Sequence, residues 1–347
     1  MPIGGSPGFD YRSKLPYSHH YDFSIQRQIA SSSLLTIAFV GTEGHHLIVQ
    51  REANPGNAAL CLATPGCGPF GEDSIYTLSN GQSVNGTRPY SVTSGRFLNQ
   101  GRVDFSNNDF TSTIANSVYN SLQITFEKRV GDVRLLGAYT WSKSIDNDSA
   151  LNEMVNPFNE RLSRAISSFD VPHNFVVSYM WDLPFGRLTS SSLGKTLLGG
   201  WSVSGITRFA TGLPVTMRET DDGSLCGCGG VDYPNYNDQP IQKFEPRASA
   251  THQYFGTSPF SPEIVGIPGN SARRFFYGPG INNFDLALHK AVRFKEKVDL
   301  EYRAEFFNAF NHAQFMTPQG NVNSSTFGDV TAARDPRIIQ MALKLGF

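Results

Sequence analysis

Residues 339–347, Ile-Gln-Met-Ala-Leu-Lys-Leu-Gly-Phe, decide the fold of this chain because their polarity changes at every step. Successive side chains of a β-strand point to opposite faces, so residues two apart share a face. One face of this segment collects its large apolar side chains, Ile339, Met341, Leu343, Leu345 and Phe347. The other face receives small or polar residues. The pattern predicts a β-strand with one apolar face.

The segment before it, residues 297–306, alternates more sharply. Its apolar residues are Val298, Leu300, Tyr302, Ala304 and Phe306, and the five residues that alternate with them are all charged: Lys297, Asp299, Glu301, Arg303 and Glu305. On a helix, at about 100° per residue, five such charges would scatter around the axis, whereas on a strand they share one face. A soluble β-sandwich could present that face to water, so this segment alone favours a membrane barrel only modestly.

Similar alternation recurs upstream and predicts about nine strands of roughly 9–13 residues. The other seven lie around residues 20–28, 35–39, 122–126, 133–142, 177–183, 201–209 and 284–288. Strands of soluble proteins usually have about 5–6 residues, whereas a tilted strand needs about 9–11 residues to cross a membrane. The chain is therefore predicted to be all-β, with strands of a membrane-crossing length.

The connections between these strands are predicted to alternate between short and long. Short connections are expected after Gln28, where the link is about five residues long, at Val130-Gly131-Asp132 and at Lys295-Glu296. The link at 184–199 is intermediate. The long connections are residues 42–118, 145–170, 213–280 and 311–335. Barrels of the bacterial outer membrane have short periplasmic turns and long extracellular loops. We therefore expect the C-terminal part of a large antiparallel transmembrane β-barrel in the cell outer membrane.

Composition is consistent with this interpretation. Charged residues make up only 17% of the chain and nearly balance, 29 Lys and Arg against 30 Asp and Glu, so nucleic acid is not an expected partner. Phe and Tyr are plentiful, mean hydropathy is −0.28, and no stretch approaches the roughly 18 apolar residues of a membrane helix. Membrane barrels give such a weak hydropathy signal because their strands are apolar on one face only.

The N-terminus is expected to be incomplete. Residues 1–8 lack the charged start and apolar core of a secretory signal. The first predicted strand, 20–28, and the last both run toward the periplasm, and an odd number of strands cannot close as an even-stranded barrel. We therefore expect at least one strand upstream and interpret the chain as a fragment.

Six stretches of the sequence carry a resemblance to a known family. They are Tyr-Asp-Phe-Ser-Ile-Gln-Arg-Gln (21–28), Phe-Val-Gly-Thr-Glu-Gly-His-His-Leu (39–47), Tyr-Asn-Ser-Leu-Gln-Ile-Thr-Phe-Glu-Lys-Arg (119–129), Tyr-Thr-Trp-Ser-Lys-Ser-Ile-Asp (139–146), Phe-Asp-Val-Pro-His-Asn-Phe (169–175) and Arg-Ala-Glu-Phe-Phe-Asn-Ala-Phe-Asn-His (303–312). In this order they resemble TonB-dependent outer-membrane receptors, particularly the Oar-like barrels with a carboxypeptidase-regulatory-like N-terminal domain. Together they span nearly the whole chain.

The resemblance implies a barrel of about 22 strands occluded by an N-terminal plug. Such a receptor takes up its substrate when the TonB complex pulls on a plug segment. Residues 1–347 depart from that pattern, because they contain no plug domain, no TonB box and no regulatory-like domain. They are interpreted as a partial receptor-like barrel, and TonB coupling is expected only through a plug supplied upstream.

Two groups of residues are candidate sites. Phe347, with Leu345, Leu343 and Met341 before it, resembles the C-terminal signal read by the barrel-assembly machinery, which needs a free strand edge with an apolar outward face. The alternative is a core strand that ends in Phe. The predicted lumen-facing charges Asp299, Glu301, Arg303, Glu305 and Arg134 line a possible substrate path. Their simpler interpretation is a set of mutual ion pairs in a wet interior.

The remaining candidates carry no expected chemistry. Tyr139, Trp141, Tyr179, Trp181 and Trp201 fit the aromatic girdles that meet the lipid interface, or ordinary core positions. The adjacent pairs His19-His20 and His45-His46 would point to opposite faces of a strand rather than chelate one metal. Asp221-Asp222 and Asp146-Asn147-Asp148 lack EF-hand spacing and are expected in solvated loops.

Cysteine spacing points to a loop disulfide rather than to a metal site. Cys61 and Cys67 lie within loop-like sequence, without a His or a second CxxC at zinc-site spacing, and are expected to pair. A bond between Cys226 and Cys228, which are two residues apart, would be strained, so free thiols and pairing elsewhere are alternatives equal to that bond. No cofactor is expected. With no nucleophile elbow, Walker loop or His-Glu-x-x-His motif, nothing supports an enzyme.

The sequence thus predicts an outer-membrane nutrient receptor or transporter in contact with lipid. Its external loops, 42–118 and 213–280, would bind an unidentified extracellular nutrient such as a glycan breakdown product, a peptide or a metal chelate. One alternative is a plugless porin-like or structural barrel. Another is a soluble β-sandwich that works as a carbohydrate-binding module or glycoside hydrolase.

Overall fold

The computed structural model describes residues 7–94, 105–151, 153–294 and 298–347. The described residues contain nine long strands: β2 (Tyr17–Ala30), β3 (Ser33–Glu52), β6 (Asp109–Val130), β7 (Val133–Asp146), β10 (His173–Asp182), β11 (Trp201–Ala210), β14 (Ile281–Phe294), β15 (Val298–Phe307) and β16 (Ile338–Gly346). Each matches one strand expected from the alternating pattern. The predicted all-β fold is confirmed.

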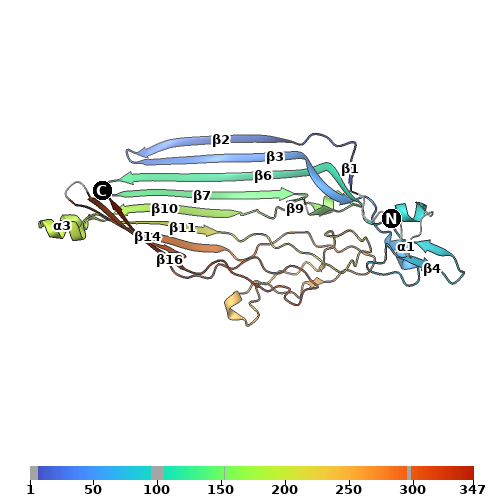
Figure 1. Cartoon of the computed structure of the whole chain (residues 1–347). Helices are drawn as coiled ribbons and strands as arrows, with labels where there is room; N and C mark the ends of the chain where they lie inside the picture. Colours follow the sequence, from blue (N-terminus) through green and yellow to red (C-terminus); the bar gives the residue numbers. More distant parts are fainter. Residues whose placement is uncertain (1–6, 95–104, 152, 295–297) are drawn as a thin grey trace.

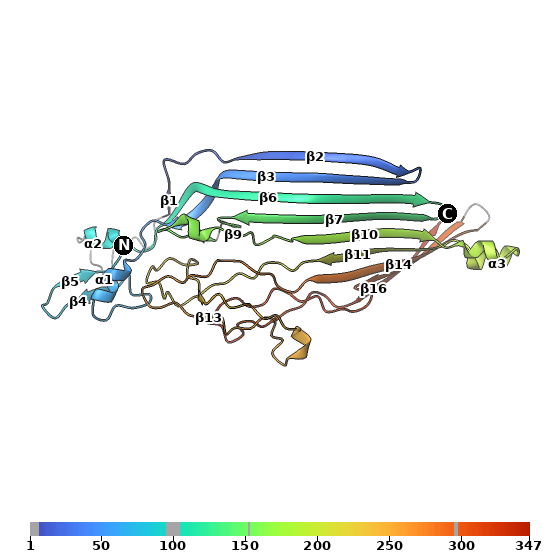
Figure 2. The ribbon, with the colours of Figure 1, turned by 180° about the vertical axis from the view of Figure 1, so that it is seen from behind.

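All nine long strands belong to one antiparallel sheet. Their order is β16-β15-β14-β11-β10-β7-β6-β3-β2, so each long strand pairs with its neighbours along the chain. Three short strands join the sheet away from this path: β1 (Gly8–Phe9), β8 (Met154–Val155) and β9 (Ala165–Ile166). The strands lie side by side along the length of the molecule (Figures 1 and 2). The sheet is open, with β2 at one edge and β16 at the other.

The register of the sheet separates an apolar face from a charged face. Met341 pairs with Ala304, Ala304 with Leu288, and Leu288 with Val203. The row then continues through Trp181 to Val133. We call this side of the sheet the apolar face. The residues between these positions form the charged face, where Gln340 pairs with Glu305.

Tight turns join the strands at one end of the sheet. Ser31 and Ser32 alone separate β2 from β3, because β2 runs two residues beyond the predicted Gln28. Gly131 and Asp132 join β6 to β7, as predicted, and Gly131 has a φ of +53° that suits glycine. The predicted turn at Lys295-Glu296 lies outside the described residues. The intermediate link contains the short helices η2 (Pro184–Leu188) and α3 (Ser192–Leu198).

At the other end the structure differs from the expected loop of residues 42–118. β3 continues to Glu52 and β6 begins at Asp109, so residues 42–52 and 109–118 of the expected loop belong to these two strands. These extensions carry Thr, Ser, Glu and Gln and have no purely apolar face. The alternation of apolar and polar residues is therefore lost in these extensions, although the backbone pairing between β3 and β6 continues to Glu52 and Asp109. The remaining segment contains α1 (Ala58–Ala63), β4 (Ile75–Thr77), β5 (Ser83–Asn85) and α2 (Pro89–Ser94).

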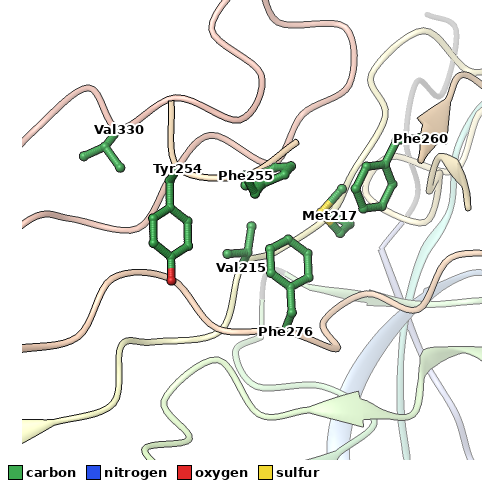
Figure 3. Close-up of a cluster of buried hydrophobic side chains, with 7 residues drawn as sticks. All are labelled: Val215, Met217, Tyr254, Phe255, Phe260, Phe276 and Val330. Carbon is green, nitrogen blue, oxygen red and sulfur yellow. The ribbon is translucent and has the colours of Figure 1, made fainter. Parts of the chain in front are cut away.

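The largest cluster of buried apolar side chains lies among the long connections. Val215, Met217, Tyr254, Phe255, Phe260, Phe276 and Val330 pack together (Figure 3). They come from residues 213–280 and 311–335, which contain only short elements: β12 (Asn235–Tyr236), η3 (Pro246–Ala248) and β13 (Phe260–Ser261). The long connections therefore form a packed unit of their own, which we call the loop unit.

Candidate functional site

The four predicted charges of β15 lie on the charged face and are paired. Arg303 lies 3.7 Å from Glu301 and 3.5 Å from Glu305, measured between charged atoms. Asp299 accepts a 2.7 Å hydrogen bond from Nε of Arg293. All of these side chains keep some contact with solvent. The arrangement matches the simpler interpretation of mutual ion pairs, and contact with a substrate stays a prediction.

Arg134 shares the charged face with these residues. The row of paired positions from Glu305 passes through Ala287, Ser204 and Met180 to Arg134. Arg134 and Glu305 both line an open hollow of about 640 Å³ on the sheet. The structure thus places all five predicted charges on one face, but it brings only two of them to this hollow.

A second cavity, of about 620 Å³, lies in the loop unit. It is lined mainly by residues 216–222 and 227–233, with Phe70, Glu153 and Arg273 contributing from other segments. We call it the loop cavity. The exposed residues Arg218 and Thr220 line it beside the buried Met217 and Glu219. The lining therefore combines aromatic, apolar and charged groups from distant parts of the sequence.

A group of buried carboxylates borders the loop cavity. The Glu219 carboxylate accepts hydrogen bonds from the backbone N–H of Glu263, the shorter being 2.9 Å. Glu263 in turn accepts from the N–H groups of Tyr233 and Gly269. Asp232 accepts a 2.5 Å hydrogen bond from the Ser224 hydroxyl. These contacts join residues up to 50 positions apart, from Glu219 to Gly269, into one network.

Burial disfavours the charged form of these carboxylates. It raises the pKa of Glu219 to about 8, with a further contribution from a hydrogen bond to Asp221. It also raises the pKa of Asp232 to about 7, and the pKa of Glu263 lies above its ordinary value for the same reason. Near neutral pH the edge of the loop cavity therefore holds protons that free carboxyl groups would have released.

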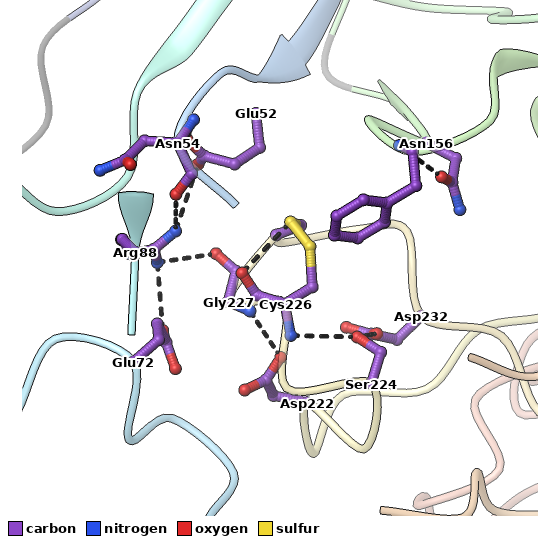
Figure 4. Close-up of a disulfide and its surroundings, with 12 residues drawn as sticks. Glu52, Asn54, Glu72, Arg88, Asn156, Asp222, Ser224, Cys226, Gly227 and Asp232 are labelled. Atoms are coloured by element: carbon purple, nitrogen blue, oxygen red, sulfur yellow. Dashed lines mark hydrogen bonds and ion pairs between the residues drawn. A yellow bond between two sulfur atoms is a disulfide. The ribbon is translucent and has the colours of Figure 1, made fainter. Parts of the chain in front are cut away.

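A buried arginine joins this region to the loop after β3. Arg88 donates through Nε to Asp73 at 2.7 Å and through Nη2 to Glu72 at 3.1 Å. It also donates to the backbone carbonyls of Asn54 and Gly227. Figure 4 shows Arg88 between Glu72, Asn54 and Gly227. Arg88 thus connects the loop after β3 to the loop unit at Gly227.

The cysteines lie near this network. Cys61 and Cys67 are joined by a disulfide within the loop after β3, as the sequence predicted. Cys226 and Cys228 are also joined to each other, one of the arrangements that the sequence left open (Figure 4). Both members of the second pair are buried.

The aspartates expected in solvated loops include two that are buried, so that expectation was wrong for them. Asp146 is 3% exposed and accepts a 2.6 Å hydrogen bond from Nη2 of Arg273. Asp222 is also 3% exposed and accepts from the backbone N–H groups of Phe70 and Gly227. Buried carboxylates need such partners because desolvation penalises an unpaired charge.

Arg273 and its neighbour Arg274 connect the loop unit to the loop end of the sheet, opposite the tight turns. Glu153 lies 2.5 Å from Arg273 and also pairs with Arg274. Both arginines are 2% exposed. Because Asp146 is the last residue of β7, the pairs hold the loop unit on that strand end. Two adjacent arginines were the only sequence signal, and they did not reveal their partners.

The stretch Phe-Asp-Val-Pro-His-Asn-Phe (169–175) has a local structural role. Asp170 accepts hydrogen bonds from the N–H of Ser144 at 2.7 Å and from the Tyr277 hydroxyl at 2.6 Å. Lys143 lies 3.6 Å from the same carboxylate. Asp170 therefore ties β7, the start of β10 and the long connection before β14 together.

The histidine pairs and the aromatic residues lie in the sheet. His19 of β2 and His45 of β3 are diagonal neighbours, with ring centroids 5.7 Å apart, while His20 contacts Thr42. Within the described part of the chain, no group of three or more His, Cys, Asp and Glu side chains is placed to hold a metal ion. Nor does any helix there have the length and apolar character needed to cross a membrane.

The five predicted girdle residues share the apolar face. Trp181 lies near the end of β10 and Trp201 at the start of β11, both at the turn end of the sheet. Trp141 lies toward the loop end of β7, next to Tyr139 on the same face. The tryptophans thus stand near opposite ends of the strands.

The C-terminal residues lie on the free edge of the sheet. Met341, Leu343 and Leu345 of β16 are between 58% and 70% exposed, and Phe347 is fully exposed. An apolar, unpaired edge is what the predicted assembly signal requires. Recognition by the barrel-assembly machinery stays a prediction.

Comparison with known proteins places the chain in context. A family model described as an outer membrane beta barrel domain matches residues 4–340. No curated protein matches the chain significantly. Solved structures similar to it include the outer membrane transporter YddB from Escherichia coli, with 11% identity and a TM-score of 0.48 over 99% of this chain and 34% of that one.

Two further solved structures are similar to the same extent. The ferric citrate transporter FecA has 10% identity and a TM-score of 0.42, covering 95% of this chain and 31% of that one. The siderophore receptor PirA from Acinetobacter baumannii has 10% identity and a TM-score of 0.43, covering 95% and 32%. The chain spans about a third of the length of each of these structures.

Proposed function

The chain belongs to the outer membrane β-barrel domain family, and we propose that it forms part of a receptor that takes up a nutrient across that membrane. It is located in the cell outer membrane, with its short turns in the periplasm and its long loops outside the cell. The loop unit is then the first part of the protein that an extracellular nutrient meets.

The loop cavity is the observation that carries this proposal. Its volume of about 620 Å³ lies within the range of small-molecule sites, about 300–1,000 Å³. Its walls are held in place by buried ion pairs and by the cluster of buried apolar side chains around Phe255. The acidic residues of its lining outnumber the basic ones, but burial keeps Glu219 and Asp232 protonated near neutral pH. A neutral nutrient such as a glycan fragment therefore fits better than an anion, and a basic peptide fits where these carboxyl groups release their protons.

The charged face of the sheet would form the path behind the cavity. In a barrel it lines the interior, where Arg134 and Glu305 border the open hollow of about 640 Å³ on the sheet. Energised transport through such a path requires a plug and the TonB complex. We propose that any coupling to TonB takes place through a plug segment outside residues 1–347.

Filling the loop cavity tests the proposal. Thr220→Trp places a large ring in the lining at an exposed position. Outer membranes that contain the protein are incubated with labelled maltodextrins or with a labelled lysine-rich peptide, and saturable binding is measured. We expect one of these probes to bind and Thr220→Trp to weaken that binding at least about tenfold, as lost contacts of about 1.4 kcal/mol would do.

Thr189→Trp is the matched control, because Thr189 lies in the periplasmic link far from the loop cavity. It should bind like the unchanged protein. Equal binding by the Thr220→Trp protein would exclude the loop cavity as the site. If the unchanged protein binds neither probe saturably, yet neutral sugars cross vesicles that contain it without saturation, the porin-like alternative is correct instead.

A further inference from the structure

The link between β10 and β11 differs from the other periplasmic turns described. Residues 184–199 form η2 and α3, which fold back on each other as a compact hairpin. The two arms approach so closely that a Cβ atom on Gly186 would lie 2.9 Å from Cα of Gly199. We call residues 184–199 the periplasmic hairpin. Figures 1 and 2 show α3 at the opposite end of the molecule from α1 and β4.

Two side chains hold the hairpin to the apolar face of the barrel wall. The Trp201 indole N–H donates a 3.1 Å hydrogen bond to the carbonyl of Leu197. The Lys290 ammonium donates to the carbonyls of Thr196 at 2.8 Å and Leu197 at 3.0 Å, and also to that of Gly199. Lys290 pairs with Trp201 across the sheet, and its Nζ lies 5.3 Å from the centre of the indole ring. The C-terminal end of α3 is thus fixed on the lipid side of the wall.

The hairpin exposes apolar side chains. Leu188 and Leu193 are each 78% exposed, and Leu197 is 70% exposed. Leu193 and Leu197 are four residues apart on α3, so they project from the same side of the helix. A cluster of exposed leucines on a soluble surface would be unfavourable, but at the edge of a bilayer the same side chains can enter the acyl region. Leu197 is hydrogen-bonded through its carbonyl to Trp201, which lies on the apolar face.

A polar hollow accompanies the leucines. It has a volume of about 470 Å³ and lies between the hairpin and the end of β14. Lys195 and Arg293 line it together with the hydroxyl-bearing residues Ser190, Ser192 and Thr196. Arg293 lies on the charged face of β14, where it is already paired with Asp299, so Lys195 is the cation of the hollow that remains for a ligand. Lys195 forms no ion pair with any residue that the structure describes, and residues 184–199 contain no acidic residue.

We propose that the periplasmic hairpin is a lipid-binding element of the inner leaflet of the outer membrane. Leu188, Leu193 and Leu197 insert between acyl chains, and the hollow beside Lys195 takes the phosphate of an anionic phospholipid headgroup. Cations and hydroxyl groups are the partners that a phosphate needs, and basic residues at a membrane surface attract anionic lipids. This role is independent of the nutrient that the receptor carries.

Insertion can be measured on the full chain. A cysteine introduced as Leu193→Cys and labelled with an environment-sensitive fluorophore reports the polarity around α3. Leu151→Cys is the matched control, since Leu151 is a leucine of the extracellular loops that is 58% exposed. In phospholipid nanodiscs we expect a blue-shifted emission at position 193, quenched by lipids that carry a quencher near the headgroup. The label at position 151 should behave as in water.

A water-like emission at position 193 in nanodiscs overturns the proposal. If that label is water-like in nanodiscs but shielded in native outer membranes, a protein partner covers the hairpin instead of lipid. If the label at position 151 is quenched as strongly as the label at position 193, the labelled chains are not folded in the nanodisc as expected. The lipids that the unchanged protein retains, measured below, then test the proposal.

Headgroup selection is tested with the unchanged protein and Lys195→Gln. Native mass spectrometry counts the lipids retained after extraction from vesicles of equal parts phosphatidylcholine and phosphatidylglycerol. We expect the unchanged protein to prefer phosphatidylglycerol, and Lys195→Gln to reduce the preference about fivefold, the contribution of one lysine near an anionic surface. Lys14→Gln, in the extracellular part, should change nothing. No preference in the unchanged protein, or displacement of the lipid by inorganic phosphate alone, contradicts a lipid site.

Discussion

Arg88 joins the loop after β3 to the loop unit, and its side chain is only 2% exposed. Replacing it with alanine would leave the carboxylates of Glu52 and Glu72 buried without their cation. Breaking a buried ion pair from one side costs about 3–5 kcal/mol. We therefore expect Arg88→Ala to unfold the loops at much lower urea concentrations, as measured by protease cleavage within residues 42–118.

Arg129→Ala is the control for this prediction. Arg129 also lies near a carboxylate, at 3.9 Å from Glu127, but its side chain is 80% exposed. Exposed pairs contribute little to stability. The two variants should therefore differ clearly, and equal urea midpoints would show that Arg88 does not organise the loops.

Glu219 makes the stability of the loop unit depend on pH. Its pKa is raised by burial from 4.5 to about 8, so the folded loops bind a proton that the unfolded chain releases. The stabilisation by this proton is complete below pH 4.5 and is lost as the pH rises through about 8. We expect residues 213–280 to resist urea and protease better near the lower end of this range.

Glu219→Gln tests the origin of that pH dependence, because glutamine keeps a similar shape and does not titrate. The urea midpoint of the variant should change less between the two ends of the range than that of the unchanged protein. Asp238→Asn, an exposed loop position, should leave the pH dependence as it is. The prediction fails if the Glu219→Gln protein keeps the full dependence.

At the scale of the elements, β16 separates lipid from the barrel interior by its alternation. Met341 lies on the apolar face and Ala342 on the charged face, where it pairs with Arg303. An arginine on the lipid side of a barrel costs about 2–4 kcal/mol at the bilayer midplane. We expect Met341→Arg to lower the folded fraction of the protein in lipid vesicles titrated with urea.

Ala342→Arg adds the same side chain one residue further along and faces the wet interior. It should fold better than Met341→Arg, although the like charge of Arg303 opposite it has some cost. Equal loss of folding in both variants would mean that β16 does not separate two environments.

The elements also show what could be predicted from sequence. All nine long strands were found because period-two alternation is a local signal, and the turn at Gly131 was found for the same reason. The packed loop unit was missed, because its contacts join distant residues. Asp146 and Arg273 are 127 positions apart, and Arg88 and Gly227 are 139 apart. No local pattern records such partners.

For the whole molecule, the cluster of buried apolar side chains around Phe255 should determine the stability of the long connections without affecting the nine-stranded sheet. Phe255 is fully buried and contacts Phe260, Phe276 and Phe327 edge to face. Phe→Ala in a core typically costs about 3–5 kcal/mol. We expect Phe255→Ala to make the long connections sensitive to protease, while the far-ultraviolet circular dichroism of the strands in detergent stays unchanged.

Phe175→Ala is the comparison, since Phe175 lies on the apolar face of β10 and is 39% exposed. It should leave the loops protected. A loss of strand signal in Phe255→Ala would show that the wall depends on the aromatic cluster.

The position of that cluster means that the molecule folds in two solvents. Most fully buried apolar side chains of the described residues lie in the long connections, which leave water by packing on one another. The strands instead turn their apolar side chains outward and leave water by entering hydrocarbon. Urea therefore weakens mainly the packing of the long connections. The thickness and composition of the bilayer affect mainly the stability of the strands. The two halves of one polypeptide can be stabilised separately, through the medium that each one faces.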